Sequence, residues 1–229
     1  MSMNFDYTVV RSSNRNKLTI TVERDRRVVI HAPEGTTDQK IAQIVQSKKQ
    51  WICEKIAHPQ KYQTLPHGPG KELVNGESAL YLGRFYRIEI VEGESSHIQF
   101  SQCFLIPKDL SKRGIEPLRA WYISKAKEKI IPRVKLYAIH LNVVISQVKI
   151  IDEHYRWGSC TVNNNINLNW RLIKAPMFVI DYVVIHELTH LLEANHTPRF
   201  WSIVRSQIVN VDKAKNWLKE NGQLLEEKL

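Results

Sequence analysis

Residues 183–192 read Val-Val-Ile-His-Glu-Leu-Thr-His-Leu-Leu. The two histidines, His186 and His190, are four positions apart, so on a helix both imidazoles lie on one face, one turn from each other. Glu187 is offset by one position, from which its carboxylate can reach a water molecule bound to an ion between the histidines. This spacing predicts a metal site that activates water.

The residues around this pentapeptide are apolar on nearly every side, which predicts a largely buried helix over about residues 176–194. Two imidazoles and a carboxylate in such a helix would cost several kcal/mol without partners, and a bound cation would be such a partner. The alternative is a cluster of polar side chains that satisfy one another in the core. The surroundings of the pentapeptide favour the metal.

His196 is the candidate third ligand and stands ten positions after His186. A continuous helix cannot direct His196 back towards the metal, so the chain must turn first. Asn195 can end the helix in the left-handed conformation, and Thr197 can cap the helix that follows. We therefore expect His196 in a tight corner between two helices, from which its ring can fold back.

Glu193 is the competitor for the third position, because it lies on the next turn after His190. It is expected either to orient an imidazole through a hydrogen bond or to lie at a solvated helix end. Imidazole ligands favour Zn²⁺, although other divalent transition metals suit the same donors. Three protein ligands would leave a fourth position for water.

The chain as a whole predicts an α+β fold, with an N-terminal strand-rich region over residues 1–107 and a metal-binding catalytic region over residues 108–229. Alternating runs predict strands over residues 18–22, 28–30, 79–82, 85–91, 98–100, 104–106, 148–155 and 166–171. Helical spacing predicts helices over about residues 37–58, 116–141, 176–194, 198–209 and 211–221. The first two strands are expected to form a hairpin, and residues 72–106 a meander. The proline- and glycine-rich residues 58–71 are expected to be a linker.

Composition limits the class of protein. The formal net charge of +10 favours anionic partners such as nucleic acid or nucleotides, although scattered basic residues also suit an ordinary surface. No segment is apolar enough to span a bilayer, so no membrane partner is expected. The three cysteines are far apart and lack metal-site spacing, which favours a cytoplasmic setting.

Four segments around the histidines carry a more specific pattern. They are Arg156–Cys160, Asn167–Leu172, Asp181–His190 and Asn195–Trp201. Together with Arg11-Ser12 and Tyr81–Tyr86 they resemble the YgjP-like metal-dependent hydrolases, which are related to the SprT-like zinc proteases. The resemblance covers most of the chain. It implies a zincin-like core of the SprT/gluzincin type, with the metal on His186, His190 and His196 and with Glu187 as the catalytic residue.

The candidate substrate-binding residues are Arg156, Asn167, Asn169 and Arg171. The segment that contains them is expected to form a strand pair beside the metal, and the edge strand of a zincin can pair with an extended peptide. Asn167, Asn169 and Arg171 would share one strand face and form a polar, cationic cleft wall. The alternative is that the two asparagines are the solvated face of a half-buried sheet.

Three functions stay open from the sequence. The zincin geometry favours a cytoplasmic metallopeptidase that acts on a peptide or protein, with Glu187 as the general base. A nucleotide phosphohydrolase on the same site would suit the positive charge, but the chain lacks a glycine-rich phosphate loop. The third possibility is an SprT-like protease or module that acts on protein bound to nucleic acid.

Overall fold

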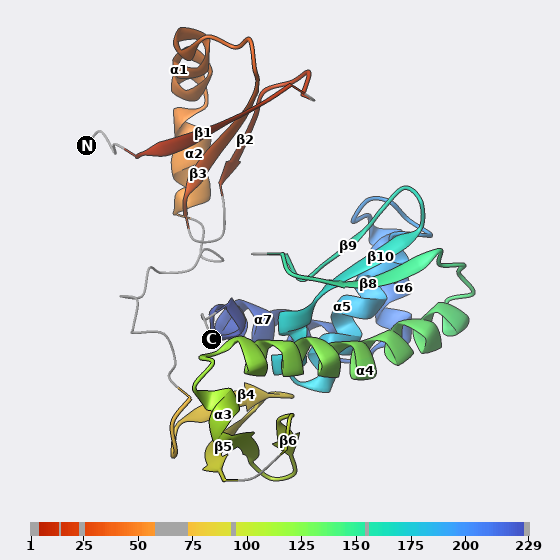
Figure 1. The fold of residues 1–229 in the computed structure, drawn as a ribbon. Coiled ribbons are helices and arrows are strands. Elements are labelled where there is room, and N and C mark those ends of the chain that lie inside the picture. Colours follow the sequence, from red (N-terminus) through yellow and green to blue (C-terminus); the bar gives the residue numbers. More distant parts are fainter. Residues whose placement is uncertain are drawn as a thin grey trace. The chain divides into compact units, whose positions relative to one another are not determined.

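The computed structural model describes residues 5–13, 15–22, 26–57, 73–92, 95–153 and 156–226. The chain divides into two compact units, Met1–Pro66 and His67–Leu229, and each has its own hydrophobic core (Figure 1). Both units combine helices with small sheets, which confirms the predicted α+β class. The linker predicted over residues 58–71 lies outside the described residues.

In the first unit a sheet packs against two consecutive helices. Its elements are β1 (Tyr7–Ser12), β2 (Thr19–Val22), β3 (Val28–Pro33), α1 (Asp38–Ser47) and α2 (Lys49–Ile56). The predicted β2–β3 pair is antiparallel, whereas β1, which was not predicted, pairs parallel with β3. The single helix predicted here is two helices that meet at Lys48, and Thr37 caps the first by accepting a hydrogen bond from the Lys40 amide.

The second unit holds all later elements. Its strands are β4 (Ser78–Tyr81), β5 (Arg84–Val91), β6 (Gln99–Phe100), β7 (Phe104–Pro107), β8 (Gln147–Ile151), β9 (Gly158–Cys160) and β10 (Asn165–Asn169). Its helices are α3 (Lys108–Ser111), α4 (Glu116–His140), the 3-10 helix η1 (Trp170–Lys174), α5 (Met177–Thr189), α6 (Pro198–Gln207) and α7 (Val211–Glu226). The sheets have the strand orders β4-β5-β7-β6 and β8-β10-β9. The prediction of a meander, in which neighbouring strands are antiparallel, is therefore wrong, because β5 and β7 pair parallel.

The sheet β4-β5-β7-β6 belongs to the same unit as the histidines, whereas the sequence placed a boundary after residue 107. The turn between β4 and β5 makes two backbone hydrogen bonds to η1, from the Leu82 amide to the Ile173 carbonyl (3.0 Å) and from the Gly83 amide to the Lys174 carbonyl (2.8 Å). Gly83 has a φ of +82°, and a Cβ at this position would lie 2.5 Å from the Pro176 ring. These long-range contacts join the sheet to the start of α5.

The long helix predicted over residues 116–141 is α4, and Pro132 lies inside it. Its predicted apolar face is buried at Leu118, Tyr122, Ala126, Ile130 and Val134. Trp121 of the same helix contacts the rings of Tyr81 and Phe104, each with a centroid separation of 5.0 Å. In the described part of the chain, no helix has the length and apolar character needed to cross a membrane.

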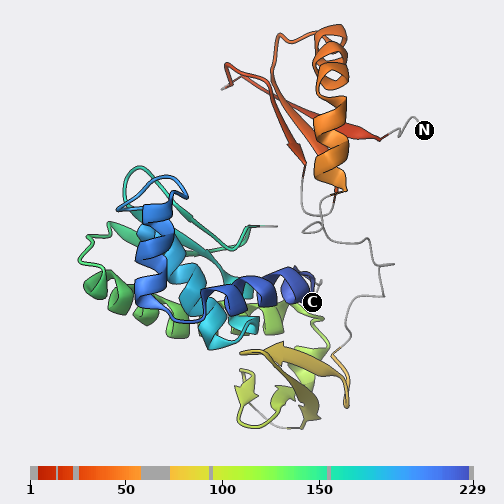
Figure 2. The ribbon, with the colours of Figure 1, turned by 180° about the vertical axis from the view of Figure 1, so that it is seen from behind.

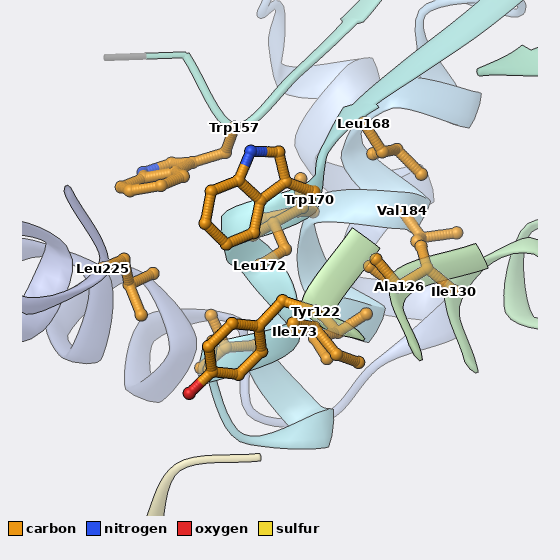
Figure 3. Packing of buried hydrophobic residues seen from close by; sticks show 14 of the residues in the cluster. Tyr122, Ala126, Ile130, Trp157, Leu168, Trp170, Leu172, Ile173, Val184 and Leu225 are labelled. Atoms are coloured by element: carbon orange, nitrogen blue, oxygen red, sulfur yellow. The ribbon is translucent and has the colours of Figure 1, made fainter. Parts of the chain in front are cut away.

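Strand β10 ends at Asn169, and η1 follows where the sequence predicted a strand that continues to residue 171. The Asn169 side chain starts η1 by accepting a hydrogen bond from the Arg171 amide (3.0 Å). Trp170 is buried, and its ring stacks on Tyr122 of α4 with centroids 6.0 Å apart (Figure 3). Residue 170 thus packs into the core from a helical turn.

Asp152, directly after β8, links α4 to η1. It accepts hydrogen bonds from Arg119 of α4 and from Arg171 of η1, the latter at 2.5 Å. Burial raises the pKa of the Asp152 carboxyl, but the two guanidinium groups more than offset this effect and leave the pKa at about 2. The ionised carboxylate therefore stabilises the folded state.

We expect Asp152→Asn to lower the free energy of unfolding at pH 7 by about 1–2 kcal/mol. The folded pKa lies below the unfolded value, so this contribution is present above about pH 4. It should be lost as the pH falls through about 2. Urea unfolding of the metal-free wild type and variant, at pH 7 and at pH 3, measures the difference. Asp109→Asn, which removes an exposed i,i+3 pair with Lys112, is the control. A difference for Asp152→Asn that does not shrink at low pH would contradict the role of its charge.

Helix α5 is the centre of the second unit. It contacts α4, α6, α7, β9 and β10, and the two opposite views place α4 on one side of it and α6 and α7 on the other (Figures 1 and 2). Val184, Ile185 and Leu188 are fully buried as a result. The predicted histidine helix is thus a core element, although His186 and the cap residue His190 remain partly exposed.

Candidate metal centre

Helix α5 ends earlier than the sequence predicted, at Thr189, with His190 as its C-cap. The amides of Leu192 and Glu193 both donate to the Thr189 carbonyl (2.9 Å each), which tightens the chain into a turn. Asn195 does not have the left-handed conformation that was expected of it. The turn therefore begins directly after His190, and the apolar run that follows does not continue the helix.

The start of α6 is as predicted. Thr197 caps it by accepting a hydrogen bond from the Phe200 amide (3.2 Å), and Pro198 occupies its first turn. His196 stands immediately before this cap. The corner between α5 and α6 therefore carries the third histidine, as the sequence predicted.

The three histidines converge. His196 Nε2 lies 3.0 Å from His186 Nε2, and one ring nitrogen of each of the three residues lies within 4.8 Å of the others. Two nitrogens bound to one tetrahedral zinc ion lie about 3.3 Å apart. The facing ring nitrogens therefore fit a shared cation, and among the described residues neither bonds to a carboxylate or a carbonyl.

The other nitrogen of His190 is fixed by the backbone. His190 Nδ1 lies 3.3 Å from the Glu193 carbonyl oxygen, so it carries the proton in this hydrogen bond and leaves Nε2 free as a ligand. The Glu193 carboxylate was expected either to orient an imidazole or to lie at a solvated helix end, and the contact to His190 is made by the Glu193 main chain. His186 Nδ1 is buried and has no hydrogen-bond partner among the described residues.

Aromatic rings support the exposed histidine. His196 stacks on Trp201, with centroids 5.8 Å apart and ring planes at 25°. It also forms an edge-to-face pair with Phe200, with centroids 4.7 Å apart. The ammonium of Lys215, on α7, lies over the Trp201 ring at 4.6 Å from its centroid and makes a cation–π contact. The ring of His196 is thus held by packing, although the residue itself is exposed.

Burial favours the neutral, metal-binding form of the His186 and His190 imidazoles. The pKa of His186 is lowered to about 3, first by burial and then by the charges that His190, His196 and Lys215 would carry. Burial is also the main cause that lowers the pKa of His190. A neutral imidazole is the form that binds a metal, so this site is ready for a cation near neutral pH.

Glu187 is 8% exposed and lies on the same helix as the first two histidines. Burial raises the pKa of its carboxyl to about 7, and the nearby charge of Arg156 opposes this shift. A carboxyl group with this pKa can both accept and release a proton near neutral pH. The position and the proton affinity of Glu187 therefore suit a general base.

The sequence analysis missed the residue that faces Glu187 from the sheet, which is Gly158 of β9. A Cβ at Gly158 would lie 2.7 Å from Glu187 Cγ and 2.9 Å from Oε1. A glycine inside a strand often marks such a close approach, and this signal was present in the sequence. Strand β9 thus passes directly over the carboxylate.

The four candidate substrate residues separate into two groups. Asn169 and Arg171 do not line a cleft, which corrects the expectation for both. Both are buried. Asn169 donates to the carbonyls of Glu153 and Arg156, and Arg171 pairs with Asp152. Their polar groups are needed to satisfy the chain inside the fold.

Arg156 lies near Glu187, whereas the Asn167 side chain contacts the neighbouring strand β9. Arg156 is exposed, acts electrostatically on Glu187 and pairs weakly with Glu153 at 3.6 Å. Asn167 is half-buried and donates to the Ser159 hydroxyl across β9 and β10 (3.2 Å). Neither side chain is buried as Asn169 and Arg171 are, so both remain candidates for the predicted cleft wall.

A family model described as the YgjP-like metallopeptidase domain matches residues 16–221, nearly the whole chain. The chain belongs to this family. As a YgjP-like metallopeptidase it is a metal-dependent hydrolase, which confirms the enzyme class and the resemblance found in the sequence. The histidine group of the structure lies inside the matched range.

Solved structures with some likeness to this YgjP-like chain include two archaeal metallopeptidase zymogens. They are jannalysin of Methanocaldococcus jannaschii (21% identity, TM-score 0.35, 42% of this chain and 97% of that one) and abylysin of Pyrococcus abyssi (18% identity, TM-score 0.37, 44% and 98%). No curated protein matches the chain. The family match alone therefore carries the identification.

Proposed function

We propose that this protein is a zinc-dependent peptidase that holds its metal with His186, His190 and His196. The observation that carries the proposal is the convergence of three imidazole nitrogens within 4.8 Å, beside a buried glutamate. Imidazole donors suit zinc, and other divalent transition metals fit the same set. A zinc ion bound here supplies a polarised water with a pKa near 7.

Glu187 is the proposed general base. It takes a proton from the attacking water on a carboxylate oxygen and passes it to the leaving amine. A pKa of about 7 allows it to perform both transfers at neutral pH. His190 contributes by keeping its Nδ1 proton on the Glu193 carbonyl, which holds its tautomer constant.

The proposed substrate is an extended peptide that pairs with β9. This strand is the edge of the sheet β8-β10-β9, next to α5. The Asn169 amide donates to the Trp157 carbonyl (2.9 Å), so alternation along the antiparallel pair directs the peptide groups of Gly158 and Cys160 away from β10. Those groups are where an added strand would bind, within reach of Glu187.

Arg156 and Asn167 are the side chains proposed to contact the substrate. Arg156 is exposed beside Glu187, where its guanidinium can bind a peptide carbonyl or carboxylate. We also propose a cytoplasmic setting, because the three cysteines are all free and far apart in the sequence. The charge of +10 adds attraction for acidic substrates.

Metal analysis and substrate panels test this function. Protein purified without added metal, analysed for its elements, is expected to contain or to take up one zinc ion per chain. The loaded protein is then incubated with unstructured peptides and, in parallel, with nucleoside triphosphates. Peptide cleavage is the expected result. Release of phosphate without peptide cleavage would replace the peptidase with a phosphohydrolase, and a chain that binds no transition metal would remove the proposal.

A further inference from the structure

The backbone of β9 comes very close to the side chain of Glu187. An ideal Cβ on Gly158 would lie 2.7 Å from Glu187 Cγ, 2.9 Å from Oε1 and 3.0 Å from Cδ. Real Cβ atoms essentially never approach other atoms closer than 3.0 Å. Any side chain at residue 158 therefore competes with Glu187 for the same space.

Glycine is required at this position for space and not for backbone conformation. The φ angle of Gly158 lies outside the left-handed range, unlike those of Gly76, Gly83 and Gly114. An alanine could adopt the backbone of Gly158 without strain. The contact with Glu187 is thus the feature that excludes it.

The backbones of both partners are held in place. Gly158 is held in register opposite Leu168, and the Asn169 side chain fixes the preceding segment by donating to the Arg156 carbonyl (2.9 Å). Glu187 lies on α5, which packs against α4, α6, α7, β9 and β10. A new methyl group would have to be accommodated by rotation of the Glu187 side chain, which is the flexible part of the contact.

We propose that Gly158 is a positioning residue for Glu187: its bare backbone forms the wall against which the carboxylate lies beside the three histidines. The proposal rests on the proposed function of Glu187 as the general base. It assigns Gly158 an effect on turnover that passes entirely through Glu187. The metal ligands are not part of this contact, because no histidine atom is among the three nearest to the Cβ position.

A stability cycle in the metal-free protein tests the contact. It compares Gly158→Ala, Glu187→Ala and the double variant by thermal unfolding. We expect Gly158→Ala to lower the melting temperature in the wild-type background. In the Glu187→Ala background, the atoms that the new methyl group would contact are absent. There Gly158→Ala should be neutral or slightly stabilising, because alanine restricts the unfolded chain. Gly35→Ala, with nothing within 4 Å of the added Cβ, is the matched control. Equal destabilisation in both backgrounds would overturn the proposal.

An activity cycle tests the consequence. Zinc-loaded Gly158→Ala is expected to lose about 10- to 100-fold in kcat, with KM and zinc content nearly unchanged. In the Glu187→Gln background, the same substitution should lower the residual activity less than about threefold, since no base is left to displace. A full additional loss in that background would mean that Gly158 acts on substrate binding or on the fold. The stability cycle needs neither metal nor substrate, so failure of the peptidase activity and failure of the contact are distinguished.

Discussion

Replacing Glu187 with Gln is expected to reduce peptide cleavage to a small residual rate while the protein keeps its zinc. The amide has the size of the carboxylate and fits the same space against Gly158, but it cannot accept the proton of the attacking water. Loss of general-base catalysis should lower kcat by about 10²–10⁴-fold. Steady-state cleavage of a peptide substrate, together with elemental analysis of the same preparation, measures both effects.

The matched control is Glu193→Gln, the same chemical change on a neighbouring glutamate that contributes only its backbone carbonyl to His190. That variant should keep both zinc and activity. Because Glu187 is buried and its carboxyl pKa is raised, Glu187→Gln should also fold at least as stably as the wild type. Loss of zinc from Glu187→Gln would make this residue a ligand and would contradict its role as the base.

His196→Ala is expected to weaken zinc binding far more than Glu193→Ala. His196 Nε2 faces His186 Nε2 at 3.0 Å, so the substitution removes a direct ligand. Glu193→Ala leaves the carbonyl that orients His190 in place, and loss of a full orienting group typically costs only 10–100-fold in affinity. Competitive titration with a chelator compares the two variants on one scale.

His97→Ala controls for the loss of an exposed imidazole, and it should bind zinc like the wild type. If Glu193→Ala released the metal while His196→Ala retained it, the site would use two histidines and a glutamate. The facing ring nitrogens of His186 and His196 would then need another explanation. Circular dichroism of each variant excludes unfolding as the cause.

The sequence predicted those elements whose apolar spacing matches their burial. The face of α4 and the β2–β3 hairpin follow directly from the pattern. Strand β1 was missed because its residues do not alternate between buried and exposed. The 3-10 helix η1 was predicted as strand because Trp170 continues the apolar–polar alternation of β10. The end of α5 was placed too late because apolar residues continue past Thr189 after its hydrogen-bond pattern has changed.

The candidate site followed the same division. His186, Glu187, His190 and His196 were predicted because their spacing on a helix and across a turn is local. The contact of Gly158 with Glu187 and the domain boundary depend on packing between segments distant in sequence, which periodicity does not report. Asn169 and Arg171 were assigned to a cleft because a strand pattern gives the face of a residue but not what covers that face.

The three histidines differ in how firmly the fold holds them. His186 belongs to a helix enclosed by the core, whereas His196 stands on an exposed corner that is fastened by a threonine cap and by stacking on Trp201. We expect local opening of that corner to need less free energy than opening of α5, because exposed turns open more readily than core helices. Metal exchange should therefore follow the opening rate of residues 190–197, and substitutions at Trp201 should shorten the residence time of the ion without changing the unfolding of the core.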